Sequence, residues 1–313
     1  MKKILIVGGC GYIGGFLTDY LKANGYEVTV YDNLLFENRF LKPCSFIFGD
    51  IRDYKKLKKI INQNDCVIWL AGLVGDGACS VNPELTKELN VDTVKWLVDN
   101  FEGKIIFPST CSVYGINNNL ISEDAQPNPL SLYAATKLEA ERYVIENKKD
   151  ALVFRLGTLF GLGDRHSRMR LDLVANILST KAAMGRPLTV FGGDQWRPLL
   201  HVRDVSTAIL HGLQNNISGL YNLSYKNYII SDLAKEITKK IPDCTVVYTD
   251  MKFEDLRNYK VNNQKYMETG WVPQFCLADG VSQIYSLIKE GRVKDITDLV
   301  YSNAAYMRKL HEF

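Results

Sequence analysis

The stretch Lys3-Ile-Leu-Ile-Val7, continued by Gly8-Gly9-Cys10-Gly11-Tyr12-Ile13-Gly14, decides the fold of this chain. An uninterrupted aliphatic run is typical of a strand that is buried on both faces of a parallel sheet. Glycines at positions 8, 11 and 14 allow a tight turn, a close approach to a pyrophosphate and tight packing of the next helix, which we expect near residues 12–24. The first N–H groups of that helix would point at the phosphates. The pattern therefore predicts a dinucleotide-binding strand-turn-helix unit.

A second strand is expected at residues 27–31, and it ends at Asp32. A carboxylate about 20 residues past such glycines accepts hydrogen bonds from the adenosine ribose and repels a 2′-phosphate. We therefore predict that the cofactor is NAD rather than NADP.

The rest of the chain alternates between strand and helix patterns. Further strands are expected at 45–48, 66–70, 104–107 and 151–155, and helices at 53–62, 84–100, 132–146 and 278–290. This alternation predicts an α/β protein with a Rossmann-type, doubly wound parallel sheet. After Leu156 the rhythm changes, so we predict an NAD-binding domain over 1–156 and a smaller, mostly substrate-binding C-terminal region over 157–313. Segments near 202–223 are expected to return to the main domain.

Composition narrows the possible partners. The 313 residues carry a net charge of +3, spread without charge runs, which favours a small anionic ligand over nucleic acid or a membrane surface. No apolar stretch has the length of a membrane span. Seven cysteines, an odd number without a Cys-x-x-Cys pair, indicate reduced thiols in a cytoplasmic protein. Four histidines and no cluster with ligand spacing predict no bound metal.

Tyr133 and Lys137 are the candidate catalytic pair. They are four residues apart in a segment whose Ala, Leu and Glu content favours a helix, so they are expected on one face. A neighbouring ammonium would lower the phenol pKa from about 10 toward neutrality, where an acid/base catalyst is useful. Thr110, at the end of an expected buried strand, could hold a substrate alcohol against the phenolate. The same spacing also occurs in ordinary exposed helix pairs, so the rest of the chain decides.

Further sequence motifs are spread along nearly the whole chain. They are Gly49-Asp50-Ile51, Leu70-Ala71-Gly72, Asn90 within Asn-Val-Asp-Thr, Ser109-Thr-Cys-Ser-Val-Tyr-Gly115, and Trp196-Arg197-Pro-Leu-Leu-His201-Val-Arg-Asp204. With the glycine turn, Asp32 and Tyr133-x-x-x-Lys137, they give a chain that resembles the extended short-chain dehydrogenase/reductase family. The resemblance is to its NAD-dependent nucleotide-sugar epimerases and dehydratases in particular.

The resemblance implies a role for each matching residue. It implies catalysis by Thr110, Tyr133 and Lys137. It implies cofactor binding by Gly8, Gly11, Tyr12, Ile13, Gly14, Asp32, Asn33, Asp50, Ile51, Leu70, Ala71, Gly72, Asn90 and Lys137. It implies binding of a nucleotide-diphosphate sugar by Val74, Ser112, Asn176, Arg168, Arg170, Arg197, Lys252 and Arg257. It also implies a homodimer that pairs the helices at 84–100 and 132–146 across a two-fold axis.

The arginines also have an independent interpretation. Arg165, Arg168 and Arg170 give one loop a positive charge suited to a diphosphate. The alternative is an exposed helix start in which Arg168 and Arg170 pair with Asp172. Arg197 has the same two interpretations, as a diphosphate ligand or as a structural residue.

The reaction is predicted to be oxidation of the carbon-4 hydroxyl of the sugar, by a 4-epimerase or a 4-dehydrogenase. Sugar 4,6-dehydratases carry an Asp-Glu pair after the hydroxyl residue, whereas Cys111 and Ser112 stand there, which removes the acid and base for dehydration. Cys111 is interpreted as a small buried residue rather than an acid. Segments 157–161 and 168–173 resemble a branch linked to surface-polysaccharide sugars, which favours a GDP-linked heptose or hexose.

Two other functions fit the sequence less well. An NADP-dependent keto-sugar reductase is disfavoured by Asp32, which would repel the 2′-phosphate. A non-enzymatic dinucleotide sensor would have no physical need for the Thr110, Tyr133 and Lys137 set.

Overall fold

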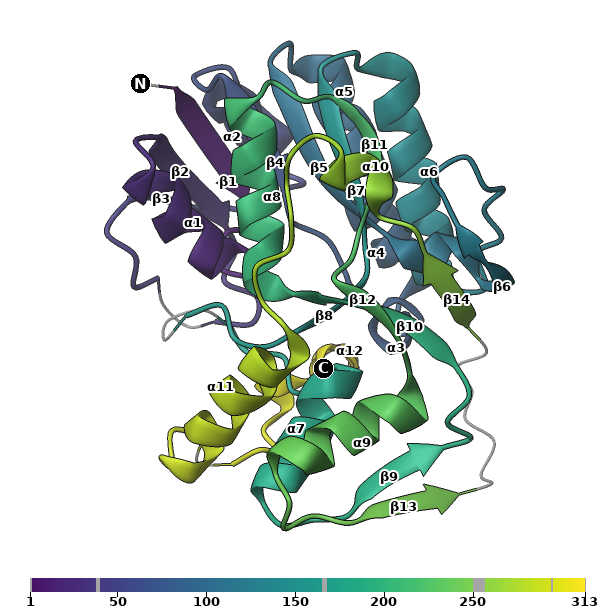
Figure 1. Ribbon diagram of the computed structural model, residues 1–313. Coiled ribbons are helices and arrows are strands. Elements are labelled where there is room, and N and C mark those ends of the chain that lie inside the picture. The colour runs from purple at the N-terminus through teal and green to yellow at the C-terminus, as the bar shows by residue number, and fades with distance from the viewer. Residues whose placement is uncertain (1, 38–39, 165–167, 250–256, 294, 313) are drawn as a thin grey trace.

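The protein is organised around a seven-stranded parallel sheet with helices on both faces (Figure 1). The computed structural model describes residues 2–37, 40–164, 168–249, 257–293 and 295–312. The strand order is β11-β7-β5-β4-β1-β2-β3. The strands are β1 (Lys3–Val7), β2 (Glu27–Asp32), β3 (Ser45–Phe48), β4 (Cys66–Trp69), β5 (Lys104–Thr110), β7 (Ala151–Leu156) and β11 (Gly219–Leu223). The predicted Rossmann-type α/β fold is confirmed.

The helices form a layer on each face of the sheet. One layer holds α1 (Gly14–Ala23) and α8 (Val202–Gln214), and the other holds α2 (Tyr54–Ile61), α5 (Thr93–Asn100) and α6 (Leu132–Asn147). Along β1, Ile4 and Ile6 pack toward the first layer, and Leu5 and Val7 pack toward the second. All four side chains are fully buried. Because both faces are covered, a strand here needs a continuous aliphatic run rather than an alternating one.

The helix expected over 84–100 is divided into three parts. It consists of α4 (Pro83–Lys87), a π-helical turn (Glu88–Asp92) and α5. A π-turn inserts an extra residue and rotates the next segment of helix, and such turns are frequent at functional sites. Here the turn carries Asn90, which is 3% exposed.

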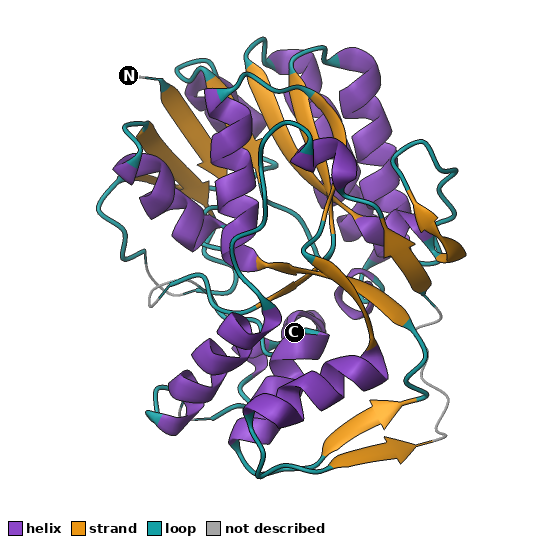
Figure 2. Ribbon diagram, in the orientation of Figure 1, coloured by secondary structure: helices purple, strands orange, loops and turns teal. Residues whose placement is uncertain are grey.

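A smaller lobe lies below the carboxyl ends of the sheet strands (Figure 2). It contains α7 (Val174–Ala183), α9 (Ile230–Lys240) and α11 (Leu277–Lys289), which share a separate core, and the pair β9 (Leu188–Phe191) and β13 (Val246–Thr249). A three-stranded sheet of β8 (Thr158–Phe160), β10 (Trp196–His201) and β12 (Lys226–Ile229) connects the two parts. Between β10 and β12 the chain passes through α8 and β11, both of which belong to the main domain.

The remaining elements lie around the junction of the two parts. They are α3 (Asp76–Cys79), β6 (Ile116–Ile121) paired with β14 (Asn258–Val261), α10 (Gln264–Met267), α12 (Asn303–His311), and 3-10 turns at Cys111–Tyr114 and Leu299–Tyr301. Helix α12 packs against α3, so the end of the chain lies at the junction (Figure 1). Within the described ranges, no helix combines the length and apolarity needed to cross a bilayer.

Candidate active site

A crevice opens where the sheet order reverses, between the carboxyl ends of β1 and β4. Gly8 has a φ of +84°, and a Cβ there would come within 2.5 Å of the Ala71 main-chain nitrogen. At Gly14 a Cβ would come within 2.4 Å of the Gly9 oxygen, so a side chain would push α1 away from the turn. These are the tight turn and the close helix packing that the sequence predicted. In parallel α/β sheets, ligands bind at this switch point.

Predicted cofactor residues line one cavity of about 360 Å³ in this crevice. They are Gly8, Gly11, Tyr12, Ile13, Gly14, Asp32, Asn33, Asp50, Ile51, Leu70, Ala71 and Gly72. Val74, Arg168 and Arg170, which the sequence assigned to the substrate, line the same cavity. The described residues therefore provide the glycine turn and the acidic ribose site that a dinucleotide requires.

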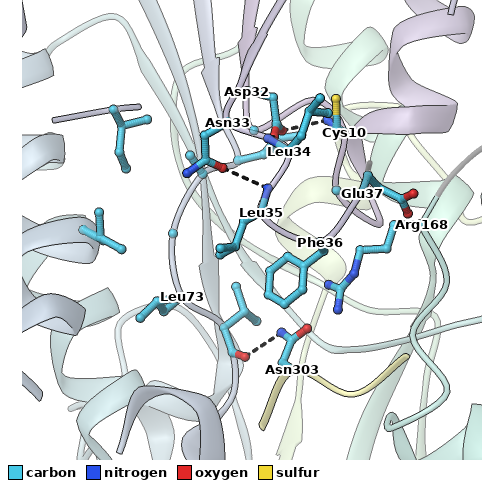
Figure 3. A pocket seen from close by; sticks show the side chains of 18 of the residues that line it. Cys10, Asp32, Asn33, Leu34, Leu35, Phe36, Glu37, Leu73, Arg168 and Asn303 are labelled. Carbon is cyan, nitrogen blue, oxygen red and sulfur yellow. Dashed lines mark hydrogen bonds between the residues drawn. The ribbon is translucent and has the colours of Figure 1, made fainter. Parts of the chain in front are cut away.

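Asp32 is fixed by main-chain donors. One carboxylate oxygen accepts a hydrogen bond from the Cys10 nitrogen at 2.9 Å, and the other accepts one from the Leu34 nitrogen at 2.7 Å (Figure 3). Burial raises the pKa of this carboxyl, although these hydrogen bonds oppose the shift. The Cys10 side chain and the Asn33 main chain also hydrogen-bond to this carboxylate, so the loop after β2 and the glycine turn hold it in place at the cavity wall.

Asn90 reaches the crevice indirectly. Its side-chain oxygen accepts from the Leu73 nitrogen at 2.8 Å, and its amide donates to the Leu73 oxygen at 2.9 Å. Asn90 thus shapes the loop after β4, and Leu73 rather than Asn90 lines the cavity. Asn90 positions this loop, and its own contact with the cofactor stays a prediction.

The catalytic candidates converge beside this loop. Thr110 is the last residue of β5, and its hydroxyl bonds with the phenol of Tyr133 on α6. The Lys137 ammonium lies 3.9 Å from the centre of the Phe107 ring, which precedes Thr110 on the same strand. The N-terminus of α6 is capped by Ser131, whose hydroxyl accepts from the Ala134 nitrogen at 3.2 Å. The cap and the strand end together position the phenol against the threonine hydroxyl.

The expected pKa shift of the phenol is wrong for the protein alone. Burial raises the pKa of Tyr133, and the opposing effects of the Thr110 hydrogen bond and of Arg170 are smaller. Burial also lowers the pKa of Lys137 to about 7. Desolvation is the largest cause of both shifts, so burial disfavours the charged form of each group. The spacing along the sequence indicates which groups are neighbours, but it does not indicate how strongly burial desolvates them and shifts their pKa values.

Residues predicted to bind the nucleotide sugar form a second group on the side of β10 and β14. Arg257 donates to the Ser112 hydroxyl at 2.9 Å and lies 3.3 Å from a carboxylate oxygen of Asp76. Arg197 donates to the main-chain oxygens of Arg257 and of Trp196. Lys252 lies outside the described residues. The sequence missed Asp76, since no motif links position 76 to position 257.

Asn176 has a structural role in this geometry. Its side-chain oxygen accepts from the Gly161 nitrogen at 2.8 Å, and its amide donates to the Arg170 oxygen at 2.7 Å and to the Tyr12 hydroxyl at 3.2 Å. The Tyr12 hydroxyl donates in turn to the Gly161 oxygen at 2.5 Å. Asn176 therefore ties the glycine turn to the smaller lobe, and its described polar atoms already have partners.

Arg168 and Arg170 are not an exposed helix start. Arg170 does pair with Asp172, through two hydrogen bonds of 3.0 Å, but its side chain is only 12% exposed. Arg168 is 5% exposed. The Arg165 position lies outside the described residues. Burial of both guanidinium groups supports a ligand-binding role more than a solvated one.

Cys111 is the buried residue that the sequence indicated. It is 0% exposed, and its thiol donates to the Arg155 oxygen at 3.1 Å. Burial raises its pKa, so it is a poor acid or nucleophile.

The sheet order, the glycine turn and the buried carboxylate at the end of β2 define a Rossmann-type dinucleotide-binding protein. Residues 4–224, more than half of the chain, match the NAD dependent epimerase/dehydratase family. The protein belongs to this family, so it is an enzyme and its cofactor is NAD, as the sequence predicted.

Individual relatives place the similarity more closely. A UDP-glucose 4-epimerase of Neisseria meningitidis serogroup C is 28% identical over an alignment of 261 positions, which covers 72% of this chain and 77% of that protein. A CDP-paratose 2-epimerase of Salmonella typhi is 26% identical, covering 90% of this chain and 98% of that protein. The structure of a UDP-glucose 4-epimerase of Thermotoga maritima with UDP-glucose matches with a TM-score of 0.81 at 24% identity, covering 93% of this chain and 99% of that one. At that identity the likeness shows the fold alone.

Proposed function

We propose that this enzyme inverts carbon 4 of a nucleoside-diphosphate sugar by NAD-dependent oxidation followed by reduction. The observation that carries the proposal is the hydroxyl pair of Thr110 and Tyr133, with Lys137 one turn further along α6. Tyr133 belongs to the same buried cluster as Leu73, which lines the dinucleotide cavity. A sensor protein has no need for this arrangement, whereas alcohol oxidation requires a group that accepts the hydroxyl proton.

Each residue of the set has a distinct task. Tyr133 takes the proton of the carbon-4 hydroxyl and returns it after reduction. Thr110 orients the sugar oxygen toward the phenol. Lys137 binds the ribose hydroxyls, and its positive charge then favours the phenolate. NAD, when bound, would supply the acceptor and donor of the hydride and a positive charge that favours the phenolate.

We place the diphosphate of the sugar nucleotide near Arg197 and Arg257. Both guanidinium groups come from elements at the junction with the smaller lobe, and Arg257 contacts Ser112, two residues after Thr110. That neighbourhood gives the sugar a short path from the diphosphate site to the phenol. Arginine suits this role because its planar donors match phosphate oxygens.

The products distinguish the proposal from its nearest alternative. A 4-epimerase yields a carbon-4 inverted sugar without net NADH, whereas a 4-dehydrogenase yields a ketone with stoichiometric NADH. The test incubates the enzyme with UDP-, GDP-, CDP- and dTDP-sugars, follows NADH absorbance and identifies the sugars by NMR. Inversion without NADH supports the proposal. Loss of water from carbons 5 and 6 would overturn it, since Cys111 and Ser112 supply no acid/base pair for that step.

The choice of epimerase over dehydrogenase draws on the relatives named above, which are epimerases. Those relatives use UDP- and CDP-sugars according to their names. The substrate panel therefore includes the GDP-linked heptose or hexose expected from the sequence beside the other nucleotide sugars. We further propose that the enzyme serves surface-polysaccharide synthesis and works in the cytoplasm. Its seven cysteines are free thiols, which suits a reducing compartment.

We propose a homodimer formed through α5 and α6. These helices lie side by side on one face of the sheet, linked by a 2.7 Å ion pair between Lys95 and Glu139. Ile145 on α6 is 42% exposed, which leaves apolar surface for a partner. An isologous contact of two such helix pairs would form a four-helix bundle.

A further inference from the structure

The end of the chain forms a wall of the cofactor cavity. Asn303, Met307, Leu310 and His311 of α12 line the same cavity as the glycine turn. The Asn303 amide donates to the Val74 oxygen at 2.7 Å, and its main-chain nitrogen donates to Asp172 at 3.0 Å. We refer to residues 299–312 as the C-terminal arm. The arm is thus fixed to the loop after β4, directly beside the crevice.

Arg168 lies between this arm and the loop that follows Asp32. Its guanidinium is 3.6 Å from the centre of the Phe36 ring, and it donates to the Val300 oxygen at 2.9 Å. Figure 3 shows Arg168, Phe36 and Asn303 close together at one side of the cavity. Phe36 also contacts the Tyr306 ring, with 5.0 Å between centres. The adenosine-side loop, the arginine and the arm therefore form one connected unit.

Two buried polar atoms of this unit have no hydrogen-bond partner within the described residues. They are Nε of Arg168 and Oδ1 of Asn303, in side chains that are 5% and 4% exposed. Buried polar groups in folded proteins are almost always paired, so such atoms require an explanation. A ligand that offers an acceptor to Arg168 and a donor to Asn303 would satisfy both.

The charge of the cavity indicates the acceptor. Arg52 and Arg170 also line the cavity, and each already donates two hydrogen bonds to a carboxylate, of Asp50 and Asp172 respectively. Arg168 is also influenced by the charges of Asp172 and Glu37, but the hydrogen bond printed for it goes to a main-chain oxygen, and its Nε has no hydrogen-bond partner among the described residues. Burial lowers its pKa to about 10, so it stays charged at neutral pH. A pyrophosphate next to the glycine turn is the anionic group of NAD that needs such a cation.

We propose that Arg168 binds the pyrophosphate of NAD, and that the C-terminal arm holds Arg168 in place and slows cofactor release. This assigns to the cofactor an arginine that the sequence had assigned to the sugar nucleotide. Release of NAD then requires the Arg168 contact to Val300 and the Asn303 contact to Val74 to open. The proposal concerns the cofactor alone, so it stands or fails independently of the sugar substrate.

The first experiment measures binding of ADP-ribose and of adenosine, which share the ribose site but differ in the pyrophosphate. Arg168→Met removes the charge and keeps most of the side-chain length. Loss of a hydrogen bond to a charged group corresponds to about 10-fold to 100-fold in affinity. The affinity of Arg168→Met for ADP-ribose should therefore fall by that factor, and its affinity for adenosine should be unchanged. Arg308→Met, on an exposed position of the same arm, is the control and should change neither affinity.

Equal weakening of ADP-ribose and adenosine by Arg168→Met would overturn the proposal, because it would show general damage to the cavity. Unchanged binding of both ligands would overturn it as well. Thermal unfolding of each variant identifies a folding defect, and Arg168→Lys provides a second variant that keeps the charge. Partial recovery of ADP-ribose binding in Arg168→Lys supports a phosphate contact.

A second experiment tests the arm. The enzyme is loaded with NADH, mixed with excess ADP-ribose, and the loss of bound NADH fluorescence gives the release rate without any sugar present. Asn303→Ala should accelerate release by about 10-fold, because the arm loses its hydrogen bond to Val74. Release at the rate of the unaltered enzyme, in a variant with an unchanged melting temperature, would refute the role of the arm.

Discussion

Lys137 provides a stability prediction whose size follows from the structure. Burial lowers its pKa from the ordinary 10.5 to about 7. Between these values the unfolded chain binds one more proton than the folded protein, so the free energy of unfolding rises with pH. Across pH 7 to 9 the two pKa values give a rise of about 2 kcal/mol. Since Lys137 is only partly buried by surface area, solvent screening reduces this to about 1 kcal/mol.

The assay compares Lys137→Met with the unaltered protein, both stripped of NAD, by denaturant unfolding at several pH values. Methionine keeps the length and packing of the side chain but cannot be protonated. The difference in unfolding free energy should therefore change by about 1 kcal/mol between pH 7 and 9, in favour of the unaltered protein at the higher pH. Buried thiols such as Cys66 and Cys79 contribute equally to both proteins and cancel.

Lys149→Met is the matched control, because Lys149 is an exposed lysine. Its curve of unfolding free energy against pH should stay parallel to that of the unaltered protein. If the curve of Lys137→Met is parallel as well, burial does not shift the pKa of Lys137, and the conclusion that desolvation dominates this site is wrong.

Other predictions concern catalysis, cofactor choice and assembly. Tyr133→Phe removes the transferable proton but keeps the ring, so turnover should fall by about 100-fold or more with little change in melting temperature; near-normal turnover would place the acid/base elsewhere. NAD should raise the melting temperature far more than NADP does, and Asp32→Ala should reduce that difference by removing the repulsion of the 2′-phosphate. Equal increases in melting temperature with the two cofactors in the unaltered protein would contradict the role of Asp32. Light scattering at micromolar concentration should give the mass of a dimer, and a monomer would contradict the proposed α5 and α6 interface.

Local features of the sequence were sufficient for the main domain. The aliphatic run of β1 and the glycines that follow it determine a buried strand, a tight turn and a close helix, because each depends on neighbouring residues only. Asp32 follows β2 directly, and Tyr133 and Lys137 share a face through the helix period alone. The fold, the cofactor and the convergence of Thr110 with Tyr133 could therefore be predicted.

The tertiary structure decided what lies around these groups. Asn303 contacts a residue 229 positions away, and Arg257 contacts Ser112 across 145 positions. Hydrophobic periodicity specifies which face of an element is buried, but not which distant loop covers it. The pKa of Tyr133 and that of Lys137 depend on desolvation by the whole surrounding protein, so spacing along the helix predicted the pair but the wrong direction for the phenol. The sequence by itself thus determined the local elements and the candidate residues for the chemistry, and only the packed structure determined the environment of those residues.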